Sequence, residues 1–166
     1  FSTNYDRAIE IAAERRGIPI DDGFRRAEDR VLASWDGHFG GDGIRLLKLH
    51  GSVSWYTELE SGTAIRLDRG YPMPDADFTL TRSGRELRPL MVLPTMEKDT
   101  LTDPYTVLAQ EFAVRTRAAR LAVVLGSSLR DQHLASVLRH QGGDMSVLVV
   151  GLGAGEAASV LSLPDV

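Results

Sequence analysis

Short apolar runs alternate along the chain with segments in which apolar residues recur every three or four positions. The runs hold four to six residues each, at 44–49, 90–93, 121–125 and 145–150. Such runs, when helical periodicity separates them, are typical of parallel strands buried on both faces of a sheet. The helical periodicity predicts helices within residues 8–13, 103–119, 129–139 and 154–161. We therefore expect an α/β fold in which helices flank a parallel sheet.

Two polar stretches interrupt this pattern, at residues 20–43 and 57–88. Both mix charged residues with glycine and proline, a composition that favours turns over buried elements. We expect them to be surface insertions, the second following a hairpin strand at residues 53–56. The chain has 166 residues, the length of one domain, and can bury a core without covalent cross-links. Residues 1–166 are therefore expected to form a single domain.

The composition limits which binding partners and which cellular compartment we expect. The net charge is −4 and no basic patch is sustained, which argues against nucleic-acid binding. No apolar run is long enough to cross a bilayer, and the first residues lack the pattern of a signal peptide. The chain has no cysteine, so disulfides and thiolate zinc sites are excluded. We expect a cytoplasmic protein that contacts neither nucleic acid nor membrane.

Three polar segments follow predicted strands and carry the candidate chemistry. They are Ser2-Thr3-Asn4-Tyr5-Asp6, Lys48-Leu49-His50-Gly51-Ser52 and Val124-Leu125-Gly126-Ser127-Ser128-Leu129. In an open α/β sheet, ligands bind outside the carboxyl ends of the strands. We therefore expect an amide, an imidazole and a Gly-Ser-Ser turn to face one crevice.

Each candidate also has a plain structural interpretation. Asn4 after a strand is commonly a helix cap, and Asp6 suits the positive end of a helix dipole. In a site, the Asn4 amide would orient a water or a ribose hydroxyl, and Asp6 would accept hydrogen bonds from a carboxamide. His50 at a strand end is often structural, but imidazole exchanges protons near neutral pH, and Gly51 allows close approach of a ligand.

The segment Gly126-Ser127-Ser128 lies between a predicted strand and a predicted helix. Small residues and hydroxyl donors at a helix start form a ready anion or ribose site, whereas the plain interpretation is a serine-capped turn. Two other segments resemble known motifs incompletely. Residues 151–156 mimic a dinucleotide fingerprint but place Glu156 at its last small position, and residues 51–55 mimic a nucleophile elbow but end in Trp55.

Together the three segments resemble the sirtuin-like domain found in many bacterial proteins, especially defence-associated effectors. Residues 2–6 are similar to the sirtuin motif Thr-Gln-Asn-Ile-Asp, and residues 48–55 resemble the bacterial form of the catalytic His-Gly segment. Pro94 with Lys98, followed by residues 126–131, resembles the later segment that ends in a Gly-Thr/Ser-Ser turn. The resemblance runs from residue 1 to about residue 150.

The resemblance implies a Rossmann-like fold that binds NAD. It places Asn4 beside the nicotinamide ribose, Asp6 against the carboxamide, and His50 as a base toward ribose or water. Thr3 and Gly51 would be further NAD contacts. The adenosine side would be lined by Gly126, Ser127 and Ser128.

Two departures from the family pattern shape the expected function. The glycine-rich phosphate loop is not in the sequence, and we expect it upstream of Phe1, in a domain truncated at its N-terminus. The four zinc-binding cysteines of protein deacylases are also absent, which favours water as the second substrate.

We expect an NAD⁺ glycohydrolase module without zinc, with NAD⁺ as its substrate, in a bacterial anti-phage or stress effector. Further domains in the same chain or a homo-oligomer are the expected partners. Two alternatives stay open. One is a non-catalytic NAD or nucleotide sensor, and the other is an NAD-dependent protein deacylase.

Overall fold

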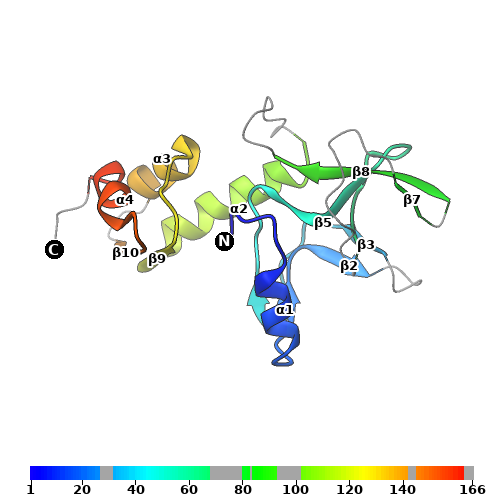
Figure 1. Ribbon diagram of the computed structural model, residues 1–166, viewed down its shortest axis with the longest axis horizontal. Coiled ribbons are helices and arrows are strands. Elements are labelled where there is room, and N and C mark those ends of the chain that lie inside the picture. Colours follow the sequence, from blue (N-terminus) through cyan, green and yellow to red (C-terminus); the bar gives the residue numbers. More distant parts are fainter. Residues whose placement is uncertain (27–31, 68–79, 83, 93–101, 142–144, 163–166) are drawn as a thin grey trace. The chain divides into compact units, whose positions relative to one another are not determined.

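The computed structural model describes residues 1–26, 32–67, 80–82, 84–92, 102–141 and 145–162. They fall into two compact units, an N-terminal unit, Phe1–Ala109, and a C-terminal unit, Gln110–Val166 (Figure 1). Helix α2 (Tyr105–Ala118) contains the division, so its first turn belongs to the N-terminal unit and the rest to the C-terminal unit.

The largest sheet lies in the N-terminal unit and is antiparallel. It has six strands in the order β2-β3-β6-β5-β8-β7. Their bounds are β2 (Phe24–Arg26), β3 (Leu32–Trp35), β6 (Ala64–Leu67), β5 (Gly51–Glu58), β8 (Arg85–Met91) and β7 (Leu80–Arg82). The chain is thus α/β, but the prediction of a Rossmann-like parallel sheet is wrong for its main sheet. Short connections such as residues 59–63, between β5 and β6, join antiparallel neighbours, whereas parallel strands need long crossovers.

The expected surface insertions contain much of this sheet. Residues 20–43 supply β2 and β3, and residues 57–88 supply β6, β7 and most of β8. A cluster of buried side chains joins these strands: Leu32, Tyr56, Ile65, Leu67 and Leu87. The insertions are therefore part of the core rather than surface excursions. Their strands are two to seven residues long and lie among charged residues, so their alternation is hard to recognise in the sequence.

A parallel arrangement does occur at the start of the chain. Strand β4 (Ile44–Arg45) pairs in parallel with β1 (Ile20–Asp21), and Lys48 forms a parallel bridge with Ser2. The N–H groups of Ile44 and Leu46 donate to one neighbour, while Leu49 donates to the carbonyl of Ser2 on the other side. Residues 44–49 therefore lie between two parallel neighbours, as expected for a buried strand. Helix α1 (Ala8–Glu14) lies between the two neighbours in sequence, after Ser2 and before β1.

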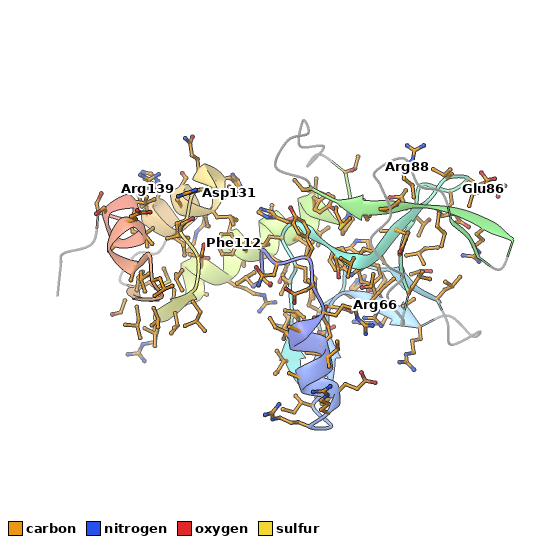
Figure 2. The ribbon with its side chains drawn as sticks, in the orientation of Figure 1. Arg66, Glu86, Arg88, Phe112, Asp131 and Arg139 are labelled. Carbon is orange, nitrogen blue, oxygen red and sulfur yellow. The ribbon has the colours of Figure 1, made fainter. Side chains whose placement is uncertain are left out.

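The C-terminal unit follows the predicted alternation of strand and helix. Strands β9 (Leu121–Leu125) and β10 (Ser146–Val150) are parallel along five residue pairs. Helix α3 (Gln132–Gln141) connects them and α4 (Ala154–Val160) follows (Figure 2). Inward residues of the strands pack with residues of the helices in one cluster: Val124, Leu129, Ala135, Val147, Val149, Ala157 and Leu161. Within this unit the pair is buried on one face only, because its residues alternate between half-buried and exposed.

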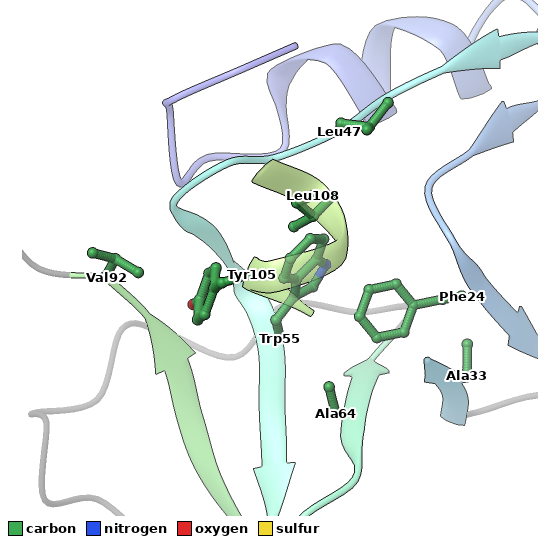
Figure 3. Close-up of a cluster of buried hydrophobic side chains, with 8 residues drawn as sticks. All are labelled: Phe24, Ala33, Leu47, Trp55, Ala64, Val92, Tyr105 and Leu108. Carbon is green, nitrogen blue, oxygen red and sulfur yellow. The ribbon is translucent and has the colours of Figure 1, made fainter. Parts of the chain in front are cut away.

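The main core of the N-terminal unit lies between the sheet and the first turn of α2. Trp55 is 1% exposed and its ring contacts Phe24 at 4.9 Å between centroids. Tyr105 and Leu108 from α2 complete this cluster (Figure 3). The core thus fixes β5, the strand that begins directly after His50, against the start of α2.

Candidate functional site

The first two predicted motifs meet in the N-terminal unit. Ser2 and Lys48 form a parallel bridge, so the two segments run side by side in the same direction. Tyr5 follows shortly after Ser2, and His50 follows shortly after Lys48. The two rings are tilted by 34° to each other, with centroids 6.4 Å apart. The N–H of Val53 donates to the Tyr5 carbonyl at 3.0 Å, so backbone as well as side chains joins the segments. The expected neighbourhood of the Asn4 and His50 segments is therefore present.

Lys48 fixes the Tyr5-Asp6 turn that follows Ser2. Its ammonium is buried and donates to the backbone carbonyl of Asp6, to Glu10 Oε1 at 3.2 Å and to Ser52 Oγ at 3.3 Å. An ammonium has three protons, and these three acceptors use all of them. Ser52 Oγ also donates to the Tyr5 carbonyl at 3.2 Å. Lysine and serine from the His-Gly segment thus bind both carbonyls of the Tyr5-Asp6 turn.

The backbone at His50 and Gly51 is fixed by strand β8 and by Tyr5. The N–H of Val92 donates to the His50 carbonyl at 2.9 Å, and the Tyr5 hydroxyl donates to the Val92 carbonyl. Gly51 has a φ of +84°, a conformation that favours glycine. A Cβ built at Gly51 would lie 2.5 Å from the Leu90 carbonyl oxygen. Glycine is therefore required here by close packing of the backbone, a structural role that stands beside its predicted role in binding.

The residues around Asn4 differ in solvent exposure and in their hydrogen bonds. Asn4 is exposed, and its backbone N–H donates to Ser2 Oγ at 3.1 Å. Asp6 is exposed too, and its Oδ1 accepts the N–H of Ala8, the first residue of α1, at 2.8 Å. Asp6 thus binds the first N–H of the helix from a position just before the N-cap residue, Arg7, rather than from the first turn. Thr3, directly before Asn4, is half-buried, and its role in binding stays a prediction.

The Gly126-Ser127-Ser128 turn lies in the C-terminal unit, directly after β9, as predicted. Ser127 Oγ accepts the N–H of Leu129 at 3.1 Å. Helix α3 begins later than expected, at Gln132, and Asp131 Oδ1 accepts the N–H groups of His133 and Leu134 (Figure 2). Asp131 therefore caps helix α3, because its carboxylate accepts two N–H groups that have no partner within the helix. The expectation that this turn opens the helix directly is wrong.

A profile of the SIR2-like domain matches residues 1–146 of this sequence. The chain belongs to the SIR2-like domain family. The match covers both the Asn4 and His50 segments and the Gly126-Ser128 turn. It confirms the resemblance seen in the sequence and supports an NAD-related function, since the SIR2-like family binds NAD. No significant match was found among curated proteins.

Several residues that shape this SIR2-like site were not among the sequence candidates. Lys48 and Ser52 belong to the His-Gly motif without a predicted role of their own, and Glu10 and Tyr105 lie within the predicted helices at residues 8–13 and 103–119. One signal for Lys48 is its position inside an apolar run, where a charged side chain must find partners. Tyr105 gave no such signal, because an aromatic residue in an apolar helix stripe is ordinary core.

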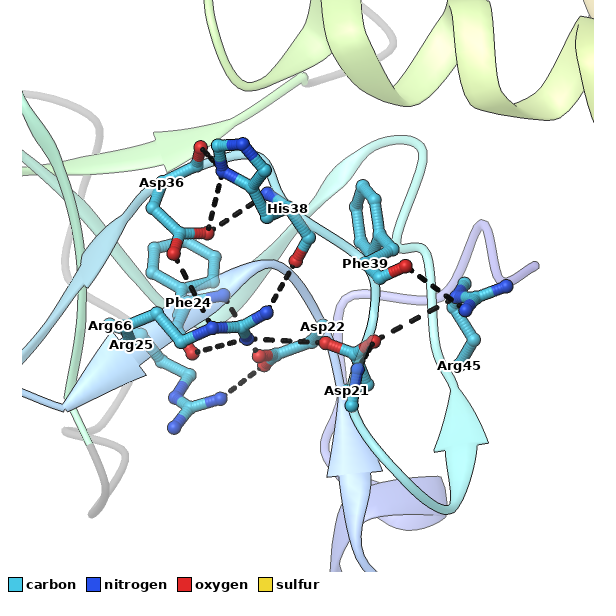
Figure 4. A network of polar contacts seen from close by, with 10 residues as sticks. Asp21, Asp22, Phe24, Arg25, Asp36, His38, Phe39, Arg45 and Arg66 are labelled. Atoms are coloured by element: carbon cyan, nitrogen blue, oxygen red, sulfur yellow. Dashed lines mark hydrogen bonds and ion pairs between the residues drawn. The ribbon is translucent and has the colours of Figure 1, made fainter.

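A second polar cluster in the N-terminal unit pairs its buried carboxylates with arginines (Figure 4). The buried Asp21 carboxylate accepts from Arg25 Nη1 at 3.2 Å and from the N–H of Gly41 at 3.0 Å. Asp22, also buried, pairs with Arg66. Burial raises the pKa of Asp22 above its ordinary value, and Arg66 opposes this shift. Because each carboxylate has a cationic partner, we assign the cluster to the packing of residues 36–45 rather than to chemistry.

Within the described ranges, no three or more histidine, aspartate or glutamate side chains gather as metal ligands would. Among the helices that the structure describes, none is long and apolar enough to cross a membrane.

Proposed function

We propose that this SIR2-like domain is an NAD⁺ glycohydrolase module. The observation that carries the proposal is the meeting of the Asn4 and His50 segments at neighbouring parallel strand ends, joined through Tyr5. Family membership supplies the ligand class, and the geometry supplies an amide-bearing turn beside an imidazole. Ends of parallel strands are the usual place for a nucleotide in α/β folds.

The reaction would break the bond between nicotinamide nitrogen and ribose C1′. Nicotinamide leaves with the electron pair of that bond, and positive charge develops on the sugar, as in other glycosyl transfers. Water then forms the new C1′–O bond and releases its proton to a base. The products are nicotinamide, ADP-ribose and one proton.

The residues of the N-terminal unit suit these steps in different ways. His50 is half-buried and its backbone is fixed by Val92, and its imidazole is the proposed group that takes the proton from water. Asn4 is exposed, so its amide can orient the water or a ribose hydroxyl. Asp6 is the proposed carboxamide contact, and its second oxygen would make this contact because Oδ1 accepts the N–H of Ala8. The adenosine contacts of Gly126, Ser127 and Ser128 stay a prediction.

The test is to incubate the protein with NAD⁺ and to separate nicotinamide and ADP-ribose by chromatography. His50→Ala and Asn4→Ala should each lower turnover by roughly 10²–10⁴-fold, the range for one positioned proton-transfer group. His133→Ala is the matched control, because His133 is an exposed histidine on α3. Full activity in both site variants would show that the assignment is wrong.

Two other results would redirect the assignment. Binding of NAD⁺ by calorimetry without any product would favour a nucleotide sensor. Release of nicotinamide only when an acylated peptide is added would favour a deacylase. Membership of an anti-phage or stress effector, and a cytoplasmic location, rest on the family resemblance and stay predictions.

A further inference from the structure

Tyr105 buries a hydroxyl for which the described part of the chain offers no hydrogen-bond partner. The residue is 4% exposed, and its oxygen has no hydrogen-bond partner among the residues that the structure describes. Buried polar atoms are nearly always hydrogen-bonded in native proteins, so each exception calls for an explanation. An isolated hydroxyl also costs the free energy of its lost hydration.

This hydroxyl lies beside the His50-Gly51 backbone. A Cβ built at Gly51 would be 2.8 Å from the Tyr105 oxygen, so the hydroxyl packs directly over that glycine. In Figure 3 the oxygen points toward Val92, the residue whose N–H binds the His50 carbonyl and whose carbonyl accepts from Tyr5. The hydroxyl therefore belongs to the same group of residues that fixes His50.

The chemistry of this phenol makes it a donor rather than a base. Burial, and to a lesser extent the neighbouring Tyr5, raises the pKa of Tyr105 above its ordinary value. The hydroxyl thus keeps its proton at physiological pH and offers it to an acceptor. The neighbouring Tyr5 hydroxyl already donates to the Val92 carbonyl. The Tyr105 hydroxyl, in contrast, has no acceptor among the described residues.

We infer that Tyr105 is a positioning residue of the His50 site, whose hydroxyl donates to an oxygen that arrives with the bound nucleotide. That oxygen belongs to the ligand itself or to a water that the ligand orders against the His50-Gly51 turn. The inference rests on the proposed NAD⁺ function. It explains why a hydroxyl is kept where phenylalanine would fill the same space in the free protein.

The test compares Tyr105→Phe with Tyr56→Phe, a matched control in the same unit. Tyr56 is 1% exposed, but its hydroxyl is partnered, since it donates to the Val53 carbonyl. Melting temperatures are measured without ligand and with saturating NAD⁺, and steady-state kinetics give kcat and KM. Tyr105→Phe should raise the melting temperature of the free protein by about 2–4 °C, because it removes an unpartnered polar atom. It should reduce the NAD⁺-induced rise and lower kcat/KM about tenfold, the value of one hydrogen bond.

Tyr56→Phe should leave the NAD⁺ response and kinetics unchanged, and it should not stabilise the free protein. A Tyr105→Phe variant with the parental NAD⁺ response and kcat/KM would overturn the inference while leaving the proposed function intact. A parent protein with neither an NAD⁺-induced rise nor product would overturn the proposed function, and this inference with it.

Discussion

Lys48 Nζ lies 3.2 Å from Glu10 Oε1, and the two side chains are only 2% and 16% exposed. The pair links the segment that leads to His50 with helix α1, whose first N–H donates to Asp6. Salt bridges at protein surfaces contribute little to stability, but a buried pair behaves differently when one partner is removed, because the other charge is left without compensation.

Lys48→Met should therefore reduce the free energy of unfolding by about 3 kcal/mol, the order expected when a buried ion pair is broken. The measurement is urea unfolding followed by fluorescence of the buried Trp55. The double variant Lys48→Met/Glu10→Leu should recover a large part of this loss, since it removes both charges. A double variant as unstable as the sum of the two single variants would show that the pair is not coupled.

Gly51→Ala should destabilise the protein more than the same substitution at Gly62. Both glycines have positive φ, +84° and +70°, so alanine is strained at each. A Cβ at Gly62 would meet no atom of the described residues within 4 Å, whereas at Gly51 it would clash with the Leu90 carbonyl. We expect a cost of ~1 kcal/mol for Gly62→Ala from its backbone conformation alone. Gly51→Ala should cost a further ~1–3 kcal/mol from overpacking.

Thermal unfolding of both variants measures this difference. Gly51→Ala should also reduce NAD⁺ turnover, because its clash displaces the turn that carries His50. Equal stability of the two variants would mean that close packing at Gly51 is not what selects glycine there.

The C-terminal unit was largely predictable from sequence because its signals are local and strong. Residues 121–125 and 146–150 are continuous apolar strands around an amphipathic helix, and parallel pairing follows from that order. The antiparallel sheet was not predictable, because strands such as β2 and β3 have only three or four residues among charged ones. Their pairing is set by contacts with distant strands rather than by local pattern.

The candidate site likewise has a part that local sequence signals predict and a part that contacts between distant residues determine. The meeting of the Asn4 and His50 segments was predictable because each follows a strand, and a parallel bridge joins those strands. The contacts that hold them were not, since Lys48 finds Glu10 across 38 positions of sequence. Likewise, nothing local to Tyr105 indicates that its hydroxyl lies against Gly51.

The stability of the fold should carry a pH dependence that originates at Asp22. Burial is the main cause that raises the pKa of this carboxyl, and Arg66 only partly offsets it. A raised pKa means that the folded state binds the proton more tightly than the unfolded state. The contribution of Asp22 to the free energy of unfolding is therefore fully present below the ordinary aspartate pKa of about 4. It is lost as pH rises through the pKa of Asp22 in the folded state.

The measurement is the free energy of unfolding from pH 3.5 to pH 7 for the parent and for Asp22→Asn. Relative to the variant, the parent should lose stability as pH rises across this range. Asp42→Asn, at an exposed aspartate, is the control and should follow the parent at every pH. A parent that gains stability over Asp22→Asn with rising pH would show that Arg66, not burial, dominates.

Asp131 rather than Ser128 should stabilise the start of α3. Its Oδ1 accepts two N–H groups at 3.0 and 3.3 Å, whereas no serine of the turn reaches a helix N–H among the hydrogen bonds of the described residues. Asp131→Ala should lower the free energy of unfolding by about 1 kcal/mol, the usual value of an N-cap. Asp131→Asn keeps the acceptor and should cost much less. Thermal unfolding distinguishes these variants from Ser128→Ala, and a larger loss in Ser128→Ala than in Asp131→Ala would restore the serine-capped interpretation of this turn.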